Sequence, residues 1–330
     1  MSNAIDVQGM TKRFGTHTAV DHIDLQVASG EICGFLGPNG SGKTTFIRML
    51  CGLLRADEGR GTCLGLDVIH ESEAIKCLVG YMTQRFSFWD DLSIAENLDF
   101  VARMYSVKNR REAVRSSLVR LGLEKRQRQL AGELSGGWKQ RLALAACMIH
   151  DPKLLLLDEP TAGVDPKARR EFWEQIHELA AQGLTFLIAT HYMDEAERCN
   201  RLAYILNGRL LARGTVEEVV AQSRLATWSV TGRDLNRLAG ELRKRPAVEQ
   251  AVAFGAALHV SGDDAAALEE AIAPFRTEGY EWRRSESGLE DVFIHLMDKS
   301  DGSDKSDRSD RSDRSDKSDK SDKSERGPAL

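Results

Sequence analysis

The chain has 330 residues, of which 42% are hydrophobic and 29% charged, and its formal net charge is -5. This length suffices for two or three domains with a substantial core. The mildly acidic balance does not imply a nucleic-acid-binding surface, and no apolar run approaches the ~20 residues that span a bilayer. The N-terminal segment lacks the charged and apolar regions of a signal peptide. Six cysteines without a CxxC pair indicate the reduced thiols of a cytosolic protein.

Residues 4–28 have the pattern of short strands. From His22 to Val27, apolar and polar residues alternate, which predicts a strand with one buried face. Between the strands lies Phe14. Its ring could stack on a nucleotide base, because every base has a π-face, or it could be an ordinary core or turn residue.

The segment from Gly37 to Thr45 reads GPNGSGKTT and fits the phosphate-binding pattern G-x-x-x-x-G-K-[ST]. An apolar run precedes it and a helix-like run follows, which is the strand-to-helix context that the motif requires. Glycines let the backbone turn its N–H groups toward phosphate oxygens, and the following helix points its positive dipole end at the same place. Lys43 is expected to reach the β- and γ-phosphates and Thr44 to hold Mg²⁺.

A helical subdomain is predicted over about residues 85–150, after a strand from Val79 to Thr83 that ends at Gln84. The segment 85–92, RFSFWDDL, gathers three aromatic rings, which could belong to the core or to a partner surface. Helical spacing then runs from Ser93 to Arg128, beginning with a capping box, and a second helix is predicted within it over about residues 111–121, ending at Gly122.

A second anion-binding pattern follows at residues 134–140, LSGGWKQ, where a serine and two glycines open a helix from Lys139 to Ile149. The next apolar run, residues 154–157, predicts a buried strand of a parallel sheet. It ends in Asp158 and Glu159, and adjacent carboxylates beside a phosphate loop indicate Mg²⁺ coordination and a general base.

The order of elements continues as a helix over 167–181 and a buried strand over 184–189 that delivers His191. A hairpin around Asn207 follows. Strands alternating with helices predict an α/β fold with a mostly parallel sheet. A histidine at the carboxyl end of such a strand is a candidate ligand-binding residue.

Residues 1–222 are therefore predicted to form one nucleotide-binding domain. Residues 223–298 read as a small α+β domain of order βαββαβ, with a final helix over 289–297 and a structural or regulatory role. Residues 299–330 repeat Ser-Asp-Lys/Arg with almost no apolar side chains, and this composition predicts disorder.

With these motifs in place, residues 4–222 resemble the ATP-binding subunits of ABC transporters. Six signals occur in the order of that family: the A-loop aromatic, Walker A, the Q-loop glutamine, the LSGGQ signature, Walker B with its glutamate, and the switch histidine; a D-loop lies at residues 163–165. One position departs from the family pattern, because Trp138 replaces the usual signature glutamine.

The resemblance implies ATP and Mg²⁺ as cofactors and hydrolysis of ATP as the reaction. It implies that ATP is bound by Phe14, Gly37, Pro38, Asn39, Gly40, Ser41, Gly42, Lys43, Thr44, Thr45, Ser135, Gly136 and Gly137. It implies Mg²⁺ ligation by Thr44, Gln84 and Asp158, and catalytic roles for Glu159, His191 and Gln84.

Segments 191–196 and 289–293 resemble the ABC-2 group of exporter ATPases. This resemblance implies a separate permease, a second copy or paralogue of the ATPase, a location on the cytoplasmic face of the membrane, and a drug-like or lipid-like exported substrate. A soluble ABC ATPase acting on ribosomes or nucleic acid is the alternative, although such relatives usually fuse two nucleotide-binding domains and no nucleic-acid partner is expected here. A regulatory module without turnover is a third reading, disfavoured by Glu159 and His191.

Overall fold

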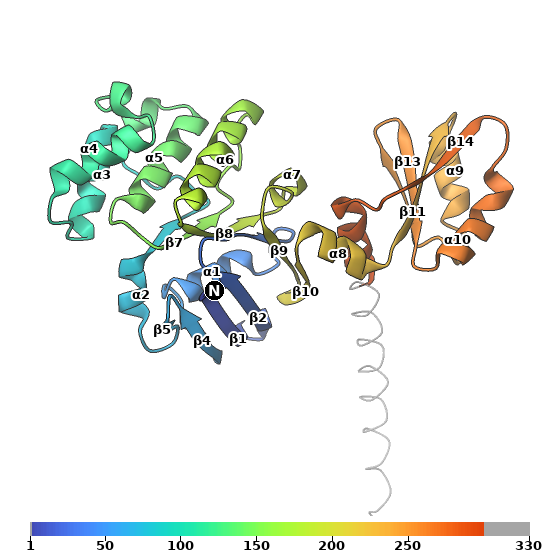
Figure 1. The fold of residues 1–330 in the computed structure, drawn as a ribbon, viewed down its shortest axis with the longest axis horizontal. Coiled ribbons are helices and arrows are strands. Elements are labelled where there is room, and N and C mark those ends of the chain that lie inside the picture. Colours follow the sequence, from blue (N-terminus) through green and yellow to red (C-terminus); the bar gives the residue numbers. More distant parts are fainter. Residues whose placement is uncertain (1, 300–330) are drawn as a thin grey trace, which may run out of the picture. The chain divides into compact units, whose positions relative to one another are not determined.

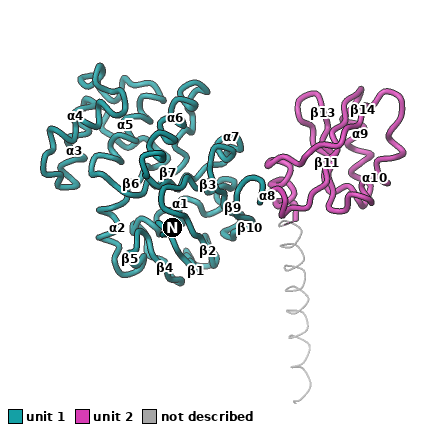
Figure 2. Tube along the Cα trace, viewed as in Figure 1, with its two compact units in different colours: residues 1–219 teal, residues 220–330 magenta. Residues whose placement is uncertain are grey.

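The computed structural model describes residues 2–299. They belong to two compact units, residues 1–219 and residues 220–330 (Figure 2). The first unit contains two sheets and the second unit one, and the two units are described separately.

The first unit is built on a six-stranded sheet whose strand order is β10-β9-β3-β8-β7-β6. Every pairing from β9 to β6 is parallel, and β10 is an antiparallel edge strand. Strands β3, β7 and β8 are buried at every position, as expected for continuous apolar runs covered on both faces. The predicted α/β fold with a mostly parallel sheet is confirmed. The strands are β3 (Ile32–Leu36), β6 (Val79–Met82), β7 (Leu154–Asp158), β8 (Thr185–Thr190), β9 (Arg201–Leu206) and β10 (Arg209–Gly214).

A second, antiparallel sheet has the order β2-β1-β4-β5. It comprises β1 (Asn3–Phe14), β2 (His17–Ala28), β4 (Glu58–Cys63) and β5 (Leu66–Asp67). Helix α1 (Lys43–Leu50) packs against both sheets (Figure 1). Its Phe46 ring stacks on Phe35 of β3 with centroids 5.0 Å apart, so the helix that follows the glycine-rich loop is anchored in the core.

Strand β4 was not expected, because its sequence, EGRGTC, has the glycines and charges of a loop. The glycines serve the pairing with β1. A Cβ on Gly61 would lie 2.2 Å from the carbonyl oxygen of Asp6, and Gly61 has φ 141°. Only a glycine fits that close approach. Helix α2 (Ser72–Leu78), which follows β5, was also not expected.

The helical subdomain contains α3 (Ile94–Met104), α4 (Arg110–Arg120) and α5 (Gly136–Met148), with short 3₁₀ turns η1 (Glu124–Arg126) and η2 (Ala131–Glu133) between them. The capping box at α3 is present, since the Ser93 hydroxyl accepts from the Glu96 amide and the Glu96 carboxylate accepts from the Ser93 amide. The second helix predicted over about residues 111–121 is confirmed as α4, and the 3₁₀ turn η1 lies in the remainder of the stretch predicted over 93–128. Helix α5 starts three residues earlier than predicted because the signature glycines are its first helical residues.

Helices α6 (Pro166–Ala181), α7 (Met193–Ala196) and α8 (Val216–Ser223) complete this region of the chain. Asp165 caps α6 through hydrogen bonds from the amides of Lys167 and Ala168. Trp173 and three other apolar residues of α6 are buried, which explains why this helix shows the amphipathic spacing that predicted it.

The second unit has a four-stranded antiparallel sheet of order β12-β13-β11-β14. This is the arrangement of a split βαβ fold, and it agrees with the predicted βαββαβ order. Its elements are β11 (Ala226–Gly232), α9 (Leu235–Leu242), β12 (Gln250–Phe254), β13 (Ala257–Gly262), α10 (Ala265–Ile272), the 3₁₀ turn η3 (Ala273–Phe275) and β14 (Tyr280–Ser285). A last helix covers residues 289–299.

The segment predicted to be disordered, residues 299–330, lies outside the described residues except for Lys299. That residue is the last one of the helix over residues 289–299, and its ammonium group pairs with the Asp263 carboxylate at 2.5 Å. Within residues 2–299, no helix combines the length and the apolar character needed to cross a bilayer.

Candidate nucleotide-binding site

The phosphate loop joins the carboxyl end of β3 to the amino end of α1, the edge where parallel α/β sheets bind ligands. Gly40 and Gly42 have φ 82° and 107°. A Cβ on Gly42 would lie 2.3 Å from the carbonyl oxygen of Ala19. This position therefore requires glycine for both its backbone conformation and its space.

Lys43 is the first residue of α1, and its side chain folds back over the loop. Its Nζ donates to the carbonyl oxygens of Gly37 and Pro38 at 2.7 and 3.0 Å and lies 3.6 Å from Glu159 Oε1. Burial lowers the pKa of this ammonium, and the Glu159 and Asp158 carboxylates oppose that effect. A buried cation is thus held against the backbone of the glycine-rich loop, where it can pair with a polyphosphate.

Thr44 and Asp158 meet although 114 residues separate them, since Thr44 Oγ1 donates to Asp158 Oδ2 at 2.8 Å. Burial raises the pKa of the Asp158 carboxyl, and the Thr44 hydrogen bond opposes this. A hydroxyl and a carboxylate are hard oxygen donors of the kind that Mg²⁺ takes in nucleotide sites. These two residues therefore fit the magnesium ion that the motifs imply.

Glu159 follows β7 in the left-handed conformation, with φ 49°, and its carboxylate collects three partners. Gln84 Nε2 donates to Oε2 at 2.8 Å, while His191 Nδ1 and Lys43 Nζ lie 3.3 and 3.6 Å from Oε1. Three residues predicted to be catalytic, from the ends of β6, β7 and β8, are therefore brought together. A non-glycine residue held at positive φ often marks a functional position.

A cleft of about 550 Å³ opens over this arrangement. Phe14, 51% exposed, stands at its rim, where a base could stack on it. The lining residues are Phe14, His17, Ala19, Asn39, Gly40, Gly42, Lys43, Thr44, Thr45, Gln84 and Glu159. His17 and Ala19 were not predicted as site residues. The pairing of His17 with Phe14 across the β1–β2 turn is the signal that could have identified His17.

The signature residues Ser135, Gly136 and Gly137 are not among those that line this cleft. Ser135 is the N-cap residue of α5, and both it and Gly136 are exposed. A Cβ on Gly137 would lie 2.6 Å from the Ala168 Cβ, so this glycine permits close packing on α6. The two segments predicted to bind phosphate, residues 37–45 and residues 134–140, therefore do not share this cleft.

The unusual signature residue, Trp138, lies between two guanidinium groups. Arg126 and Arg141 stand over its ring at 4.6 and 5.1 Å from the centroid, and Arg141 also pairs with Glu171 of α6 at 2.7 Å. The Trp138 side chain thus packs the first turn of α5 against η1.

Trp138→Gln should preserve or modestly raise ATPase activity, because Ser135 and the two glycines remain. Two cation–π contacts would be lost, together about 1–2 kcal/mol, so the melting temperature should fall by a few degrees. Steady-state ATPase assays and thermal melts of both proteins check this. A collapse of turnover with an unchanged melting curve would instead place Trp138 in the nucleotide contact.

One buried polar cluster near the site was not anticipated. Glu195, 0% exposed, accepts a hydrogen bond from the Thr161 hydroxyl, and Arg169 Nε lies 3.7 Å from its Oε1. This cluster ties the segment after β7 to α6 and to the segment after His191. Because each residue lies in a different element, sequence spacing carried no signal for it.

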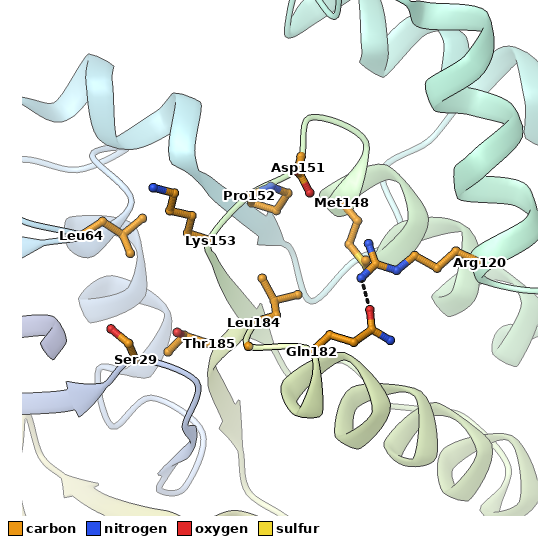
Figure 3. A pocket seen from close by; sticks show the side chains of 11 residues that line it. Ser29, Leu64, Arg120, Met148, Asp151, Pro152, Lys153, Gln182, Leu184 and Thr185 are labelled. Carbon is orange, nitrogen blue, oxygen red and sulfur yellow. Dashed lines mark hydrogen bonds between the residues drawn. The ribbon is translucent and has the colours of Figure 1, made fainter. Parts of the chain in front are cut away.

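A second cavity, of about 300 Å³, lies at the opposite, amino ends of β7 and β8 (Figure 3). Its wall includes Lys153, Thr185 and Arg120, and Arg120 donates to Gln182 Oε1 at 2.7 Å. None of the predicted site residues lines it. Ligands of parallel α/β sheets bind at the carboxyl edge, so the cleft at the phosphate loop is the candidate nucleotide site.

Comparison with known proteins agrees with this geometry. The model of the ABC transporter family matches residues 20–162. The chain is 36% identical over 304 residues to the Nod factor export ATP-binding protein I of Rhizobium sp. (strain N33), covering 90% of this chain and 97% of that relative. It is 42% identical over 221 residues to the probable multidrug ABC transporter ATP-binding protein YbhF of Escherichia coli (strain K12), covering 66% of this chain but only 38% of YbhF.

Among solved structures, the ADP conformation of MJ1267, an ATP-binding cassette of an ABC transporter, is similar with a TM-score of 0.60. The sequences are 28% identical, and the alignment covers 66% of this chain and 93% of that one. The phosphate loop, the Thr44–Asp158 pair, Gln84 and Glu159 lie within residues 20–162, which the family model matches. The chain belongs to the family of ABC transporter ATP-binding proteins.

Proposed function

We propose that this chain is the ATP-hydrolysing subunit of an exporter of the ABC-2 type. It would bind a separate membrane permease at the cytoplasmic face of the membrane and drive transport through it. The convergence of Lys43, Thr44, Asp158, Gln84 and Glu159 at one cleft carries the ATPase part of the proposal. The exporter part is supported by the relatives described above, which are named for multidrug transport and for Nod factor export. A drug-like or lipid-like substrate fits those names.

In this mechanism Lys43 and the loop amides bind the β- and γ-phosphates, and Phe14 stacks on the base. Thr44 and Asp158 would hold a magnesium ion, whose positive charge would stabilise the charge on the phosphate oxygens. Glu159 accepts a proton from the attacking water, with Gln84 and His191 orienting its carboxylate.

The two separate segments predicted to bind phosphate imply that two copies, or this chain and a paralogue, assemble around ATP. The signature of one subunit would then complete the cleft of the other. The alternative function, on ribosomes or nucleic acid, gains no support from the names of these relatives, and the chain's own charge is mildly acidic.

A permease contact is favoured by exposed apolar side chains that follow Gln84. Trp89 is 44% exposed, and its ring lies 4.3 Å from that of Phe100, which is 37% exposed. Met104 is 69% and Tyr105 40% exposed. Large apolar side chains gathered at a surface mark interaction sites, and these lie in the segment joined directly to the catalytic glutamine.

Met104→Glu should abolish co-purification with the permease from detergent-solubilised membranes, since a buried charge is costly at an apolar interface. ATPase activity of the isolated subunit should stay unchanged. Leu53→Glu, at an apolar residue that is 55% exposed outside the helical subdomain, is the matched control and should co-purify normally.

Absence of any membrane-spanning protein from the wild-type complex would contradict the transporter proposal. Normal co-purification of Met104→Glu, with a permease present, would contradict only the contact surface.

A further inference from the structure

The second unit holds a cluster of one histidine and two carboxylates away from the nucleotide cleft. His295, on the last helix, places Nδ1 2.7 Å from Glu249 Oε2 and Nε2 3.1 Å from Asp263 Oδ1. Glu249 directly precedes β12 and Asp263 directly follows β13. Three elements distant in sequence therefore bring three potential ligand atoms within 4.8 Å of one another. It is the one group of this kind among residues 2–299.

The histidine of this cluster is buried, whereas its two carboxylates are partly exposed to solvent. The His295 side chain is 4% exposed, whereas those of Glu249 and Asp263 are 32% and 40% exposed. The imidazole is therefore held in place by packing, while the carboxylates leave a route from solvent. Both properties are needed if an ion is to enter and be bound.

The charges of the cluster favour a cation. The carboxylates of Glu249 and Asp263 lie against one imidazole, and two negative charges at one site attract a positive ion. Imidazole nitrogen and carboxylate oxygen are both ligands that transition metals accept.

We propose that Glu249, Asp263 and His295 form a binding site for a divalent transition-metal ion, with Zn²⁺ as the best match. One imidazole nitrogen and two carboxylate oxygens are a ligand set that zinc accepts, and its bonds to such atoms are about 2.0–2.2 Å. Tetrahedral bonds of that length separate ligand atoms by about 3.4 Å. Glu249 and Asp263 lie against different imidazole nitrogens, so one of the two carboxylates would have to turn toward the nitrogen that binds the metal. Mg²⁺ and Ca²⁺ prefer oxygen ligands alone.

Lys299 would compete with the metal ion for the Asp263 carboxylate. Its Nζ lies 2.5 Å from Asp263 Oδ2, and its side chain is 53% exposed. An exposed lysine can turn into solvent at low cost, because a surface ion pair contributes little. The metal would take over its pairing with Asp263 and would link the last helix to the ends of β12 and β13.

The test is a Zn²⁺ titration by isothermal calorimetry on the full nucleotide-free chain, with Mg²⁺ held constant to occupy other oxygen sites. The wild type should bind one equivalent. Glu249→Gln and His295→Ala should weaken this binding at least tenfold, and Lys299→Ala should tighten it. His259→Ala is the control, because His259 is the other histidine of residues 220–299 and pairs with Asp291 instead, at 3.2 Å.

Binding that is lost in Glu249→Gln, kept in His259→Ala and tightened in Lys299→Ala supports the site. Glu249→Gln decides the question if His295→Ala fails to fold, since Glu249 is partly exposed and glutamine preserves its shape. Absence of Zn²⁺ binding by the wild type, or equal affinity in wild type and Glu249→Gln, would overturn the proposal.

Discussion

Lys43→Ala should lower ATP affinity by about 10²-fold or more and remove measurable turnover. The Lys43 ammonium lies 2.7 and 3.0 Å from two loop carbonyl oxygens, so it is already placed over the phosphate loop. Hydrogen bonds between charged groups contribute about 1.5–3 kcal/mol each, and every 1.4 kcal/mol changes affinity tenfold. Loss of two such bonds to phosphate accounts for the expected effect.

The measurement is equilibrium binding of a fluorescent ATP analogue together with an ATPase assay. Lys153→Ala is the matched control, because Lys153 lies at the opposite edge of the sheet beside the second cavity (Figure 3). That variant should bind and hydrolyse ATP normally. Wild-type affinity in Lys43→Ala, with folding intact by circular dichroism, would contradict the phosphate-loop assignment.

The local motifs were readable from the sequence because each depends on a short stretch of backbone. Gly37 to Thr45 had to lie between a strand and a helix, and it does. Asp158 and Glu159 had to end a buried strand, and β7 ends at Asp158. The fold class followed from apolar runs alternating with amphipathic helices. A continuous apolar run is typical of a strand buried on both faces, and an amphipathic helix covers such a sheet with its apolar side.

What the sequence did not reveal depends on contacts between distant residues. Strand β4 was hidden because the glycines that fit it against β1 are also the residues of loops. Trp138 was recognised as a departure, but its position between Arg126 and Arg141 required the packing of α5 on η1. The Glu249–Asp263–His295 cluster joins three elements of the second unit, and no spacing rule relates them.

The group of residues predicted to be catalytic is intermediate between these cases. Gln84, Glu159 and His191 were each proposed from the end of a strand, and β6, β7 and β8 are neighbours in the sheet. Their meeting therefore follows from the parallel topology. The particular contacts could not be foreseen, because they depend on Glu159 adopting φ 49°, which turns its carboxylate toward both neighbours.

Glu159→Gln should separate ATP binding from hydrolysis. Glutamine keeps the size of the side chain but cannot accept the proton of the attacking water, and removal of a general base typically costs about 10²–10⁴ in rate. Binding should survive, because Lys43 still faces the phosphates and Thr44 still pairs with Asp158 at 2.8 Å. Loss of the carboxylate charge 3.6 Å from Lys43 Nζ also leaves that ammonium free to pair with phosphate.

With hydrolysis blocked, ATP should remain between two subunits and a dimer should accumulate. Size-exclusion chromatography with light scattering, with and without ATP and Mg²⁺, measures this beside an ATPase assay. Glu178→Gln is the control, since it removes the same charge from an exposed position of α6 and should change neither rate nor assembly. Near-normal hydrolysis in Glu159→Gln would remove Glu159 from the catalytic role. Loss of hydrolysis without an ATP-dependent dimer would leave the base assignment in place and indicate that the second subunit is a paralogue, or that the permease is needed to hold two copies together.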